Sequence, residues 1–330
     1  MRIETSVTSV SWIPSEAITG PMRLPIDLGL GHYDDPLPDH IDNLDALRDA
    51  DKFRFANDLR AWIDVEDGRI VDAGYCGGGH IGATKVALGV GSITIPAVAF
   101  PDLQLDPTIT ATTATFTQTT GGRTGAPIPR RISRPPFVKV TAPTVWTTLT
   151  LTIHADGSHT HALTGASIMP RHFIYDDAMN LVAKSGMIDF KAWTQDSFGD
   201  NTPWGNTDSP AIVTAVETQL ERRLSTQIMR EGTKPHFRKI RAGETLVVQG
   251  DPGDELFLLL DGVLGVEVEG EPIAEVGPGS ILGERALVEG TNRTSTLRAM
   301  TPVRVAVASA GEIQPEALRE LATGHRREEN

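Results

Sequence analysis

Alternation between threonine and apolar residues, with a period of two, is the feature that most restricts how this 330-residue chain can fold. Residues 108–152 contain fifteen threonines. Within residues 113–119 every odd-numbered position is threonine, while Ala114 and Phe116 lie between them. Within residues 146–154 threonine again alternates with leucine and isoleucine. Because a strand points successive side chains to opposite faces, this pattern predicts antiparallel strands with one polar face.

Turn signals separate these strands, and helix signals are few. Asp67-Gly68 and Asp156-Gly157 are typical of two-residue hairpin turns, and Gly121-Gly122 is a weaker turn candidate. Residues 43–50 and 188–195 are the helix candidates in this part of the chain. We therefore expect a mostly antiparallel β domain, either barrel-like or a curved sheet.

A turn-rich stretch, GDNTPWGNTDSP, marks a domain boundary. It divides a β-rich domain at residues 1–208 from a linking helix within 209–235 and a second domain at 236–330. Ser209-Pro210 is a good helix start, so we expect the helix to run over residues 210–230. Apolar residues recur along it every four positions, namely Ile212, Val216, Leu220, Leu224 and Ile228. The stripe predicts either homodimerisation or docking against the following domain.

Residues 236–330 read as short strands with tight turns. A buried run, ELFLLL, ends at the turn Asp261-Gly262, and valines then alternate with glutamates over residues 264–269. Regular strands at this spacing predict a small β-roll or jelly roll with flanking helices. The fold class is therefore mainly β with some helix. Ser309 and Glu312 form a capping box ahead of a short helix at about 315–322.

Composition excludes several classes of protein. Apolar residues make up 39% of the chain, enough for a packed core, and the formal net charge is −13. Because an acidic chain repels phosphates and anionic membranes, we expect neither nucleic acid nor membrane as a partner. We interpret the two basic clusters as solvated faces; they are Arg130, Arg131 and Arg134, then Lys234, Arg238, Lys239 and Arg241. A single cysteine and the lack of an apolar leader or spanning run predict a cytoplasmic location.

The stretch GERALVEGTNRTSTLRA, residues 283–299, carries the chemistry of the second domain. Gly283 lets the backbone approach a ligand closely, and Glu284 is an acceptor suited to a sugar hydroxyl. Arg293 offers a forked donor for a phosphate, with the hydroxyl of Thr294 beside it. The residues suit a phosphate joined to a hydroxylated ring. The alternative is that the roll binds nothing and Glu284 pairs with Arg293.

This segment resembles the phosphate-binding cassette of the cyclic nucleotide-binding domain family. The family pattern is F-G-E-[LI]-[AS]-L followed by [PR]-R-[AST]-A-[TS]-[VL]-x-A, and here it reads L-G-E-R-A-L and N-R-T-S-T-L-R-A. The resemblance covers about residues 209–325. It implies that Glu284 binds the ribose 2′-hydroxyl and Arg293 the cyclic phosphate. It also implies that main-chain N–H groups around Arg285, Ala286 and Thr294 complete the phosphate site.

This chain departs from the family pattern within the cassette. Arg285 replaces the usual Leu or Ile, and Asn292 replaces a common Pro. Arg285 either extends to solvent or adds charge at the mouth of the pocket. Thr294 leaves cGMP open as the ligand, with cAMP as the default. The short helix at 315–322 leaves the base without its usual cover, which would then come from another subunit or the first domain.

The layout predicts a sensor rather than a transcription factor. Neither domain contains a clear helix-turn-helix, and helix 210–230 is the natural element to transmit ligand binding to the first domain. We expect that domain to bind a partner protein or a small molecule, or to self-associate. The alternatives are an enzyme or barrel carrier that the nucleotide gates, and, less favoured, a transcription regulator.

Two motifs of the first domain contain residues that could carry chemistry. A two-residue turn would put His154, His159 and His161 on one face, where they are either exposed hairpin histidines or Zn²⁺ ligands. Cys76 and His80 in CGGGH form a nucleophile-like pair, but a glycine-rich strand connection explains them better. We expect no catalytic residue, no metal ion and no cofactor.

Overall fold

A computed structural model provides the structure of the chain. It describes residues 1–12, 36–50, 52–53, 55–82, 84–88, 91–95, 97–123, 128–131, 138–142, 144–168, 171–185, 203, 213–214, 219–230, 236–309, 313 and 315–328. Contacts divide the described residues into two compact units, those up to residue 203 and those from residue 213 onward. The helix expected at 188–195 lies outside the described residues.

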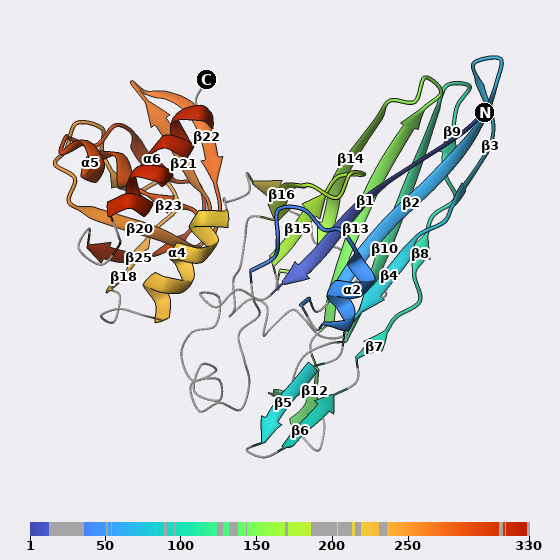
Figure 1. Cartoon of the computed structure of the whole chain (residues 1–330), viewed down its shortest axis with the longest axis horizontal. Coiled ribbons are helices and arrows are strands. Elements are labelled where there is room, and N and C mark those ends of the chain that lie inside the picture. Colours follow the sequence, from blue (N-terminus) through green and yellow to red (C-terminus); the bar gives the residue numbers. More distant parts are fainter. Residues whose placement is uncertain are drawn as a thin grey trace. The chain divides into compact units, whose positions relative to one another are not determined.

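One sheet of the first unit has the strand order β16-β15-β1-β2-β3, and β4 also pairs with β2 (Figure 1). Its strands are β1 Arg2–Trp12, β2 Phe55–Glu66, β3 Arg69–Tyr75, β4 Gly78–Ile81, β15 Arg171–Tyr175 and β16 Leu181–Ser185. Positive φ angles at Asp67 and Gly68 form the expected turn between β2 and β3. The expected helix near residue 43 is α2 Leu44–Asp49, where the side chain of Asn43 accepts a hydrogen bond from the Ala46 N–H.

The other sheet has the order β14-β13-β10-β7, with β8 and β9 pairing further along β10. Its strands are β7 Val98–Ala99, β8 Leu103–Gln104, β9 Thr108–Ile109, β10 Thr113–Arg123, β13 Thr144–His154 and β14 His159–Ala166. Two separate hairpins join β5 Thr84–Leu88 to β6 Gly91–Ile95, and β11 Ile128–Arg131 to β12 Val138–Thr141. The predicted antiparallel strands are therefore confirmed.

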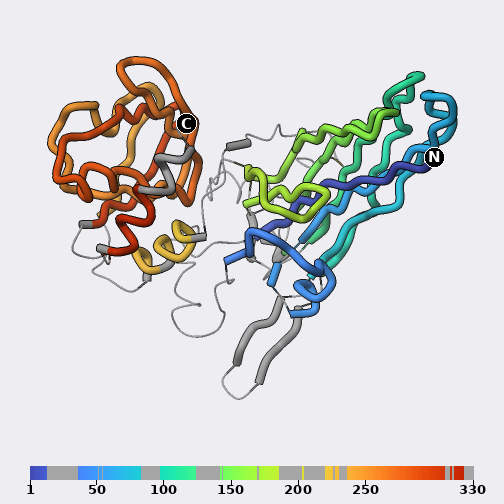
Figure 2. Tube along the Cα trace, turned by 45° about the horizontal axis from the view of Figure 1, so that its top comes forward, coloured from blue at the N-terminus to red at the C-terminus, as the bar shows by residue number. Residues whose placement is uncertain are grey.

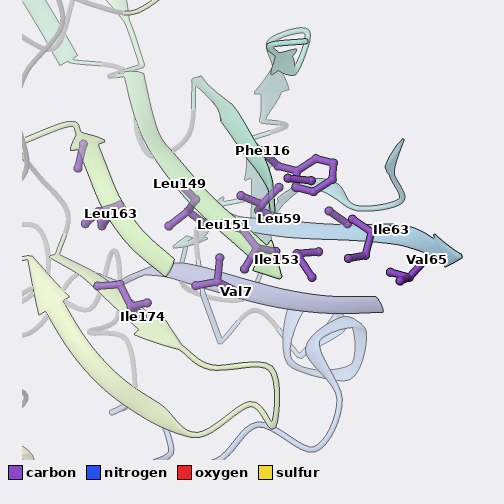
Figure 3. Packing of buried hydrophobic residues seen from close by; sticks show 13 residues of the cluster. Val7, Leu59, Ile63, Val65, Phe116, Leu149, Leu151, Ile153, Leu163 and Ile174 are labelled. Carbon is purple, nitrogen blue, oxygen red and sulfur yellow. The ribbon is translucent and has the colours of Figure 1, made fainter. Parts of the chain in front are cut away.

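The first unit is a sandwich of two sheets. Apolar side chains of both sheets meet in one buried cluster, where Phe116, Leu149 and Leu151 face Leu59 and Ile63 (Figure 3). Among the described strands no pairing joins one sheet to the other, so the barrel-like alternative is wrong. The physical reason is that each sheet already has one apolar face, and packing these faces together buries both without closing the edges.

The other face of the second sheet carries the threonines. The hydroxyl groups of Thr115 and Thr152 lie 2.9 Å apart, and those of Thr119 and Thr148 lie 2.7 Å apart. These are directly opposed residues of β10 and β13. Cross-strand pairing of this kind satisfies the hydroxyls and stabilises the sheet. The threonines therefore share one face of the sheet, as predicted, although Thr119 and Thr148 on it are buried and not exposed to water.

Toward one end, the interior of the sandwich becomes polar. Asn57 on β2 donates through Nδ2 to the carbonyl oxygens of Gln118 and Thr147, at 3.3 and 3.0 Å. Gln118 donates through Nε2 to Asn57 Oδ1 at 2.8 Å and to the Asp58 carbonyl oxygen at 3.1 Å. Asn57, Gln118 and Thr147 are all fully buried. Gln118 Oε1 in turn accepts a hydrogen bond from Gln104 Nε2 at 2.7 Å. Buried amides are tolerated here because each has partners for both its donor and its acceptor groups.

The turn expected at Gly121-Gly122 is wrong, since both glycines lie inside β10. Gly122 is opposite Ala99 of β7, and a Cβ atom at Gly122 would lie 2.3 Å from the Val98 carbonyl oxygen. Glycine is therefore required for close approach of two backbones, and no reversal of the chain occurs here.

Gly122→Ala should destabilise the first unit by about 1–3 kcal/mol, because the added methyl group would meet the β7 backbone. Urea unfolding followed by tryptophan fluorescence measures this, since all five tryptophans precede residue 205. Gly78→Ala is the control; its Cβ would meet only Asp102 Oδ2, at 2.9 Å, which is the end of an exposed side chain that can move. Equal midpoints for Gly122→Ala and the wild type would contradict the close approach of β7.

The second unit is a roll of two four-stranded antiparallel sheets, with strand orders β18-β25-β20-β23 and β19-β24-β21-β22. The strands are β18 His236–Ile240, β19 Thr245–Val247, β20 Glu255–Asp261, β21 Leu264–Val268, β22 Glu271–Val276, β23 Ile281–Leu282, β24 Thr296–Ala299 and β25 Val303–Ser309. The short helix α5 Glu284–Glu289 follows β23. The predicted roll and the turn at Asp261-Gly262 are confirmed, with Gly262 at a φ of 83°.

Two longer helices pack on this roll. Figure 2 shows α4 Gln219–Arg230, in yellow, beside α6 Pro315–Glu328, in red. Leu224 and Ile228 of α4 and Leu318 of α6 share one buried cluster with β20 and β25. Of the two uses predicted for the apolar stripe, homodimerisation and docking, the described part of α4 therefore serves docking against the roll.

No helix among the described residues has the length and the apolar composition that a membrane span requires.

The start of α4 and the end of α6 both differ from the residues that the sequence predicted. The first helix does not start at residue 210, since Val213–Thr214 is the short strand β17 and helix begins at Gln219. β-branched residues near its expected start favour extended backbone. The last helix runs to Glu328, beyond the expected end at 322. The proposed start at Ser209-Pro210 and the capping partner Glu312 lie outside the described residues.

Candidate functional site

A cavity of about 570 Å³ opens in the roll beside α5. It is bounded by β-roll strands, by the segment that contains α5 and by the first turn of α4. All six residues that the sequence pattern singled out line it, namely Gly283, Glu284, Arg285, Ala286, Arg293 and Thr294. The structure therefore brings the two halves of the cassette motif together around one space.

Arg293 is the buried cation of this cavity, with 6% of its surface exposed. Its Nη1 donates to the carbonyl oxygens of Glu255, at 3.0 Å, and Gly283, at 3.3 Å. The guanidinium carbon lies 5.2 Å from the ring centre of Phe257. Nε is buried without a hydrogen-bond partner. Burial lowers the pKa of Arg293, while the carboxylates of Glu255, Asp254 and Glu284 act in the opposite direction.

Two glycines make room for this guanidinium. A Cβ atom at Gly283 would lie 2.5 Å from Arg293 Nη1, and one at Gly253 would lie 2.7 Å from Nε. Gly283 also has a φ of 91°, a left-handed conformation that disfavours other residues, and it forms the N-cap of α5. Arg293 thus lies between two backbone segments that would collide with it if either carried a side chain.

Glu284 is the first residue of α5 and only 4% of its surface is exposed. It acts on Arg293 as a nearby negative charge. The two residues therefore bring a buried acceptor and a buried donor to the wall of the same cavity. Such a pair suits a ligand that presents both hydroxyl groups and an anionic group.

The remaining wall of the cavity is apolar. Its side chains come from β19, β21, β22 and β24. They include Val247, Val266, Val268, Ile273, Val276 and Leu297. Ile273 on the edge strand β22 is 48% exposed. A site with one charged end and one apolar wall fits a small molecule that has an anionic group and a flat ring system.

Comparison with known families agrees with this geometry. Residues 237–318 match the family described as "Cyclic nucleotide-binding domain". They form a cyclic nucleotide-binding domain. The domain is mostly β, as the sequence predicted, and its cassette lies within the matched residues. The part of the chain before residue 237 lies outside this match.

Two curated relatives of the cyclic nucleotide-binding domain are cGMP-dependent protein kinases named egl-4. The one from Caenorhabditis briggsae is 33% identical over 95 residues, which are 29% of this chain and 13% of the kinase. The one from Caenorhabditis elegans is also 33% identical over 95 residues, 29% of this chain and 12% of the kinase. The chain therefore spans only about an eighth of the length of these relatives.

Solved structures also align with the cyclic nucleotide-binding domain. One is described as "Sp-2Cl-cAMPS bound to PKAR CBD2"; it has a TM-score of 0.27 and 19% identity, and covers 34% of this chain and 71% of that chain. Another is a cyclic nucleotide-binding domain from Methylobacillus flagellatus KT, with a TM-score of 0.27 and 26% identity; it covers 35% of this chain and 71% of that chain.

Four residues around the site escaped sequence reasoning. Gly253, Glu255 and Phe257 contact Arg293 from the β19–β20 turn and β20, and Glu221 reaches the cavity from α4. The sequence GDPGD contained a signal for Gly253, because a turn this short needs only one glycine. The second glycine makes room for the Arg293 side chain. Nothing local pointed to Glu221, since its contact with the cavity depends on how α4 packs.

His154, His159 and His161 of the β13–β14 hairpin do not all lie on one face of the sheet. Asp156 Oδ1 accepts hydrogen bonds from the N–H and the hydroxyl of Ser158, which widens the loop beyond two residues. His159 is therefore opposite Ile153 and not opposite His154. His154 and His159 consequently lie on opposite faces of the sheet. Within the described residues, no three His, Cys, Asp or Glu side chains are placed to hold a metal ion.

CGGGH is the strand connection that the sequence favoured. Cys76 and Gly77 join β3 to β4, both strands pair with β2, and the rest of the motif lies in β4. A Cβ atom at Gly77 would lie 2.2 Å from the Asp58 carbonyl oxygen, which explains one of the glycines. Cys76 is exposed, and desolvation raises the pKa of its thiol. A raised pKa opposes the thiolate form that a nucleophile needs.

Proposed function

We propose that this protein is a cyclic nucleotide sensor that binds cAMP or cGMP in the cavity beside α5. The observation that carries the proposal is the Arg293 guanidinium. It is 94% buried, lines a cavity of about 570 Å³ and keeps an unpartnered Nε. A buried cation is costly unless an anion compensates it, and the cyclic phosphate supplies that anion.

In this proposal each cassette residue has a separate role. Arg293 pairs with the cyclic phosphate, and Glu284 accepts a hydrogen bond from the ribose 2′-hydroxyl. Main-chain N–H groups near Arg285, Ala286 and Thr294 complete the phosphate contacts, and Gly283 permits their close approach. The apolar wall receives the base. The Thr294 hydroxyl is compatible with cGMP as well as cAMP, because it can contact both a phosphate and a guanine.

Thermal unfolding of the full chain with cAMP, cGMP, cCMP or cUMP tests the proposal. At ligand one hundred times its dissociation constant, binding to the native state should add about 2.7 kcal/mol to the free energy of unfolding. We expect this gain with cAMP or cGMP and its loss in Glu284→Ala. No change with any of the four nucleotides would reject the proposed function.

Gly253→Ala should weaken cyclic nucleotide binding by about tenfold or more, because the added methyl group would displace the Arg293 side chain. Isothermal titration calorimetry with cAMP and cGMP measures the change. Gly265→Ala is the control, since its Cβ would first meet the flexible Met300 side chain at 3.2 Å. Unchanged affinity in Gly253→Ala would contradict the dependence of binding on this guanidinium position.

We further propose that ligand binding is relayed through α4 to the first unit, which binds a protein partner or a small molecule. The support is that α4 shares a buried cluster with the roll and precedes it in the chain. Hydrogen exchange tests the relay: the ligand should change protection at residues 219–230 and in the first unit. A change confined to residues 236–328 would reject the relay.

A further inference from the structure

We propose that Glu221 of α4 is a positioning residue of the nucleotide site, so that the functional binding domain begins at α4 and not at residue 237. The proposal rests on the proposed function and adds a residue that lies outside the matched family region. Its basis is one hydrogen bond: the main-chain N–H of Ile281 donates to Glu221 Oε1 at 3.0 Å.

The position of Ile281 explains why this bond matters. β23 is the last strand in the order β18-β25-β20-β23 of its sheet. Ile281 is fully buried, so water cannot replace a missing partner for its N–H. A buried N–H at a sheet edge needs an acceptor from elsewhere in the fold. The Glu221 carboxylate supplies that acceptor from α4 and takes the place of a neighbouring strand.

The same carboxylate lies next to the ligand site. Glu221 is 3% exposed and lines the cavity together with Gly283 and Glu284. Ile281 is two residues before Gly283, so the bond fixes the backbone just ahead of the cassette. Leu224 and Ile228 anchor the same helix in the roll. A displacement of Glu221 would therefore shift the backbone that carries Glu284.

Calorimetric titration of the full-length protein with cAMP and cGMP tests the role of Glu221. Glu221→Ala removes the acceptor and should weaken binding by about tenfold or more. Glu221→Gln keeps an acceptor oxygen and should stay within about threefold of the wild type. Glu316→Gln, an exposed glutamate on α6, is the matched control and should bind as the wild type does.

The outcomes separate the possible explanations. Wild-type affinity in a folded Glu221→Ala variant would overturn the inference and leave the proposed function intact. Failure of the wild type to bind any nucleotide would overturn the proposed function, and this inference with it. If Glu221→Ala does not fold, hydrogen exchange of the wild type decides. Nucleotide should then slow exchange at the Ile281 amide and in residues 219–230, and unchanged exchange there would reject the inference.

Discussion

Arg293→Ala should reduce affinity for cAMP and cGMP by about 30-fold or more, because truncation of one partner of a buried, hydrogen-bonded charge pair costs about 2–5 kcal/mol. Arg293 is the buried cation of the cavity, and its Nη1 is already held by the carbonyl oxygens of Glu255 and Gly283. Calorimetric titration gives the dissociation constants, and thermal unfolding without ligand shows whether the roll still folds.

Arg293→Lys refines the same test. Lysine keeps the positive charge but loses the planar fork that holds two carbonyl oxygens while presenting other N–H groups to a phosphate. We therefore expect Arg293→Lys to bind more weakly than the wild type and more tightly than Arg293→Ala. Arg319→Ala, at an exposed position on α6, is the control. Binding of wild-type strength in Arg293→Ala would show that the anion lies elsewhere.

Acid should destabilise the first unit through His172 by about 3 kcal/mol between pH 7 and pH 4. His172 is fully buried, and burial lowers its pKa from 6.5 to about 4. The unfolded chain then binds the proton more readily than the folded one. The stabilisation is therefore complete above about pH 6.5 and is lost as the pH falls toward 4.

The hydrogen bonds of His172 are consistent with a neutral ring. Nε2 lies 2.8 Å from the Ser167 carbonyl oxygen, which can only accept, and Nδ1 lies 2.7 Å from the Ser11 hydroxyl. Urea unfolding by tryptophan fluorescence at several pH values measures the effect. His172→Gln should be less stable at pH 7, with a pH profile flatter by about 3 kcal/mol than that of the wild type. Parallel profiles for the two proteins would exclude a neutral His172.

The parts predicted from sequence are those that depend on neighbouring residues. Alternation identified β10 and β13, and the Asp67-Gly68 turn followed from local backbone preferences. The cassette pattern identified six residues that line one cavity, because most of them lie on a short helix and the turn before it. Their individual roles toward a ligand stay predictions.

The parts that were missed depend on residues far apart in sequence. Gly121-Gly122 resembles a turn until β7 is known to pass close to Gly122. His159 lies opposite Ile153 and not opposite His154, because the hairpin loop that contains the Asp156–Ser158 hydrogen bond is longer than the two residues expected. Glu221 joined the site only through the packing of α4. Local patterns give the type of an element, whereas close backbone approach and register come from the assembled fold.

The paired threonines of β10 and β13 have a consequence for how these strands find their alignment. A slip of two residues would again place threonine opposite threonine, so this face fits several alignments equally well. The buried face does not, because only the observed alignment brings Gln118 and Thr147 together at Asn57. If β10 slipped, Gln118 would move away from Asn57, and both side-chain amides would lose a partner. The buried amides therefore specify the register of β10, which the repeated threonines on the other face of the sheet leave open.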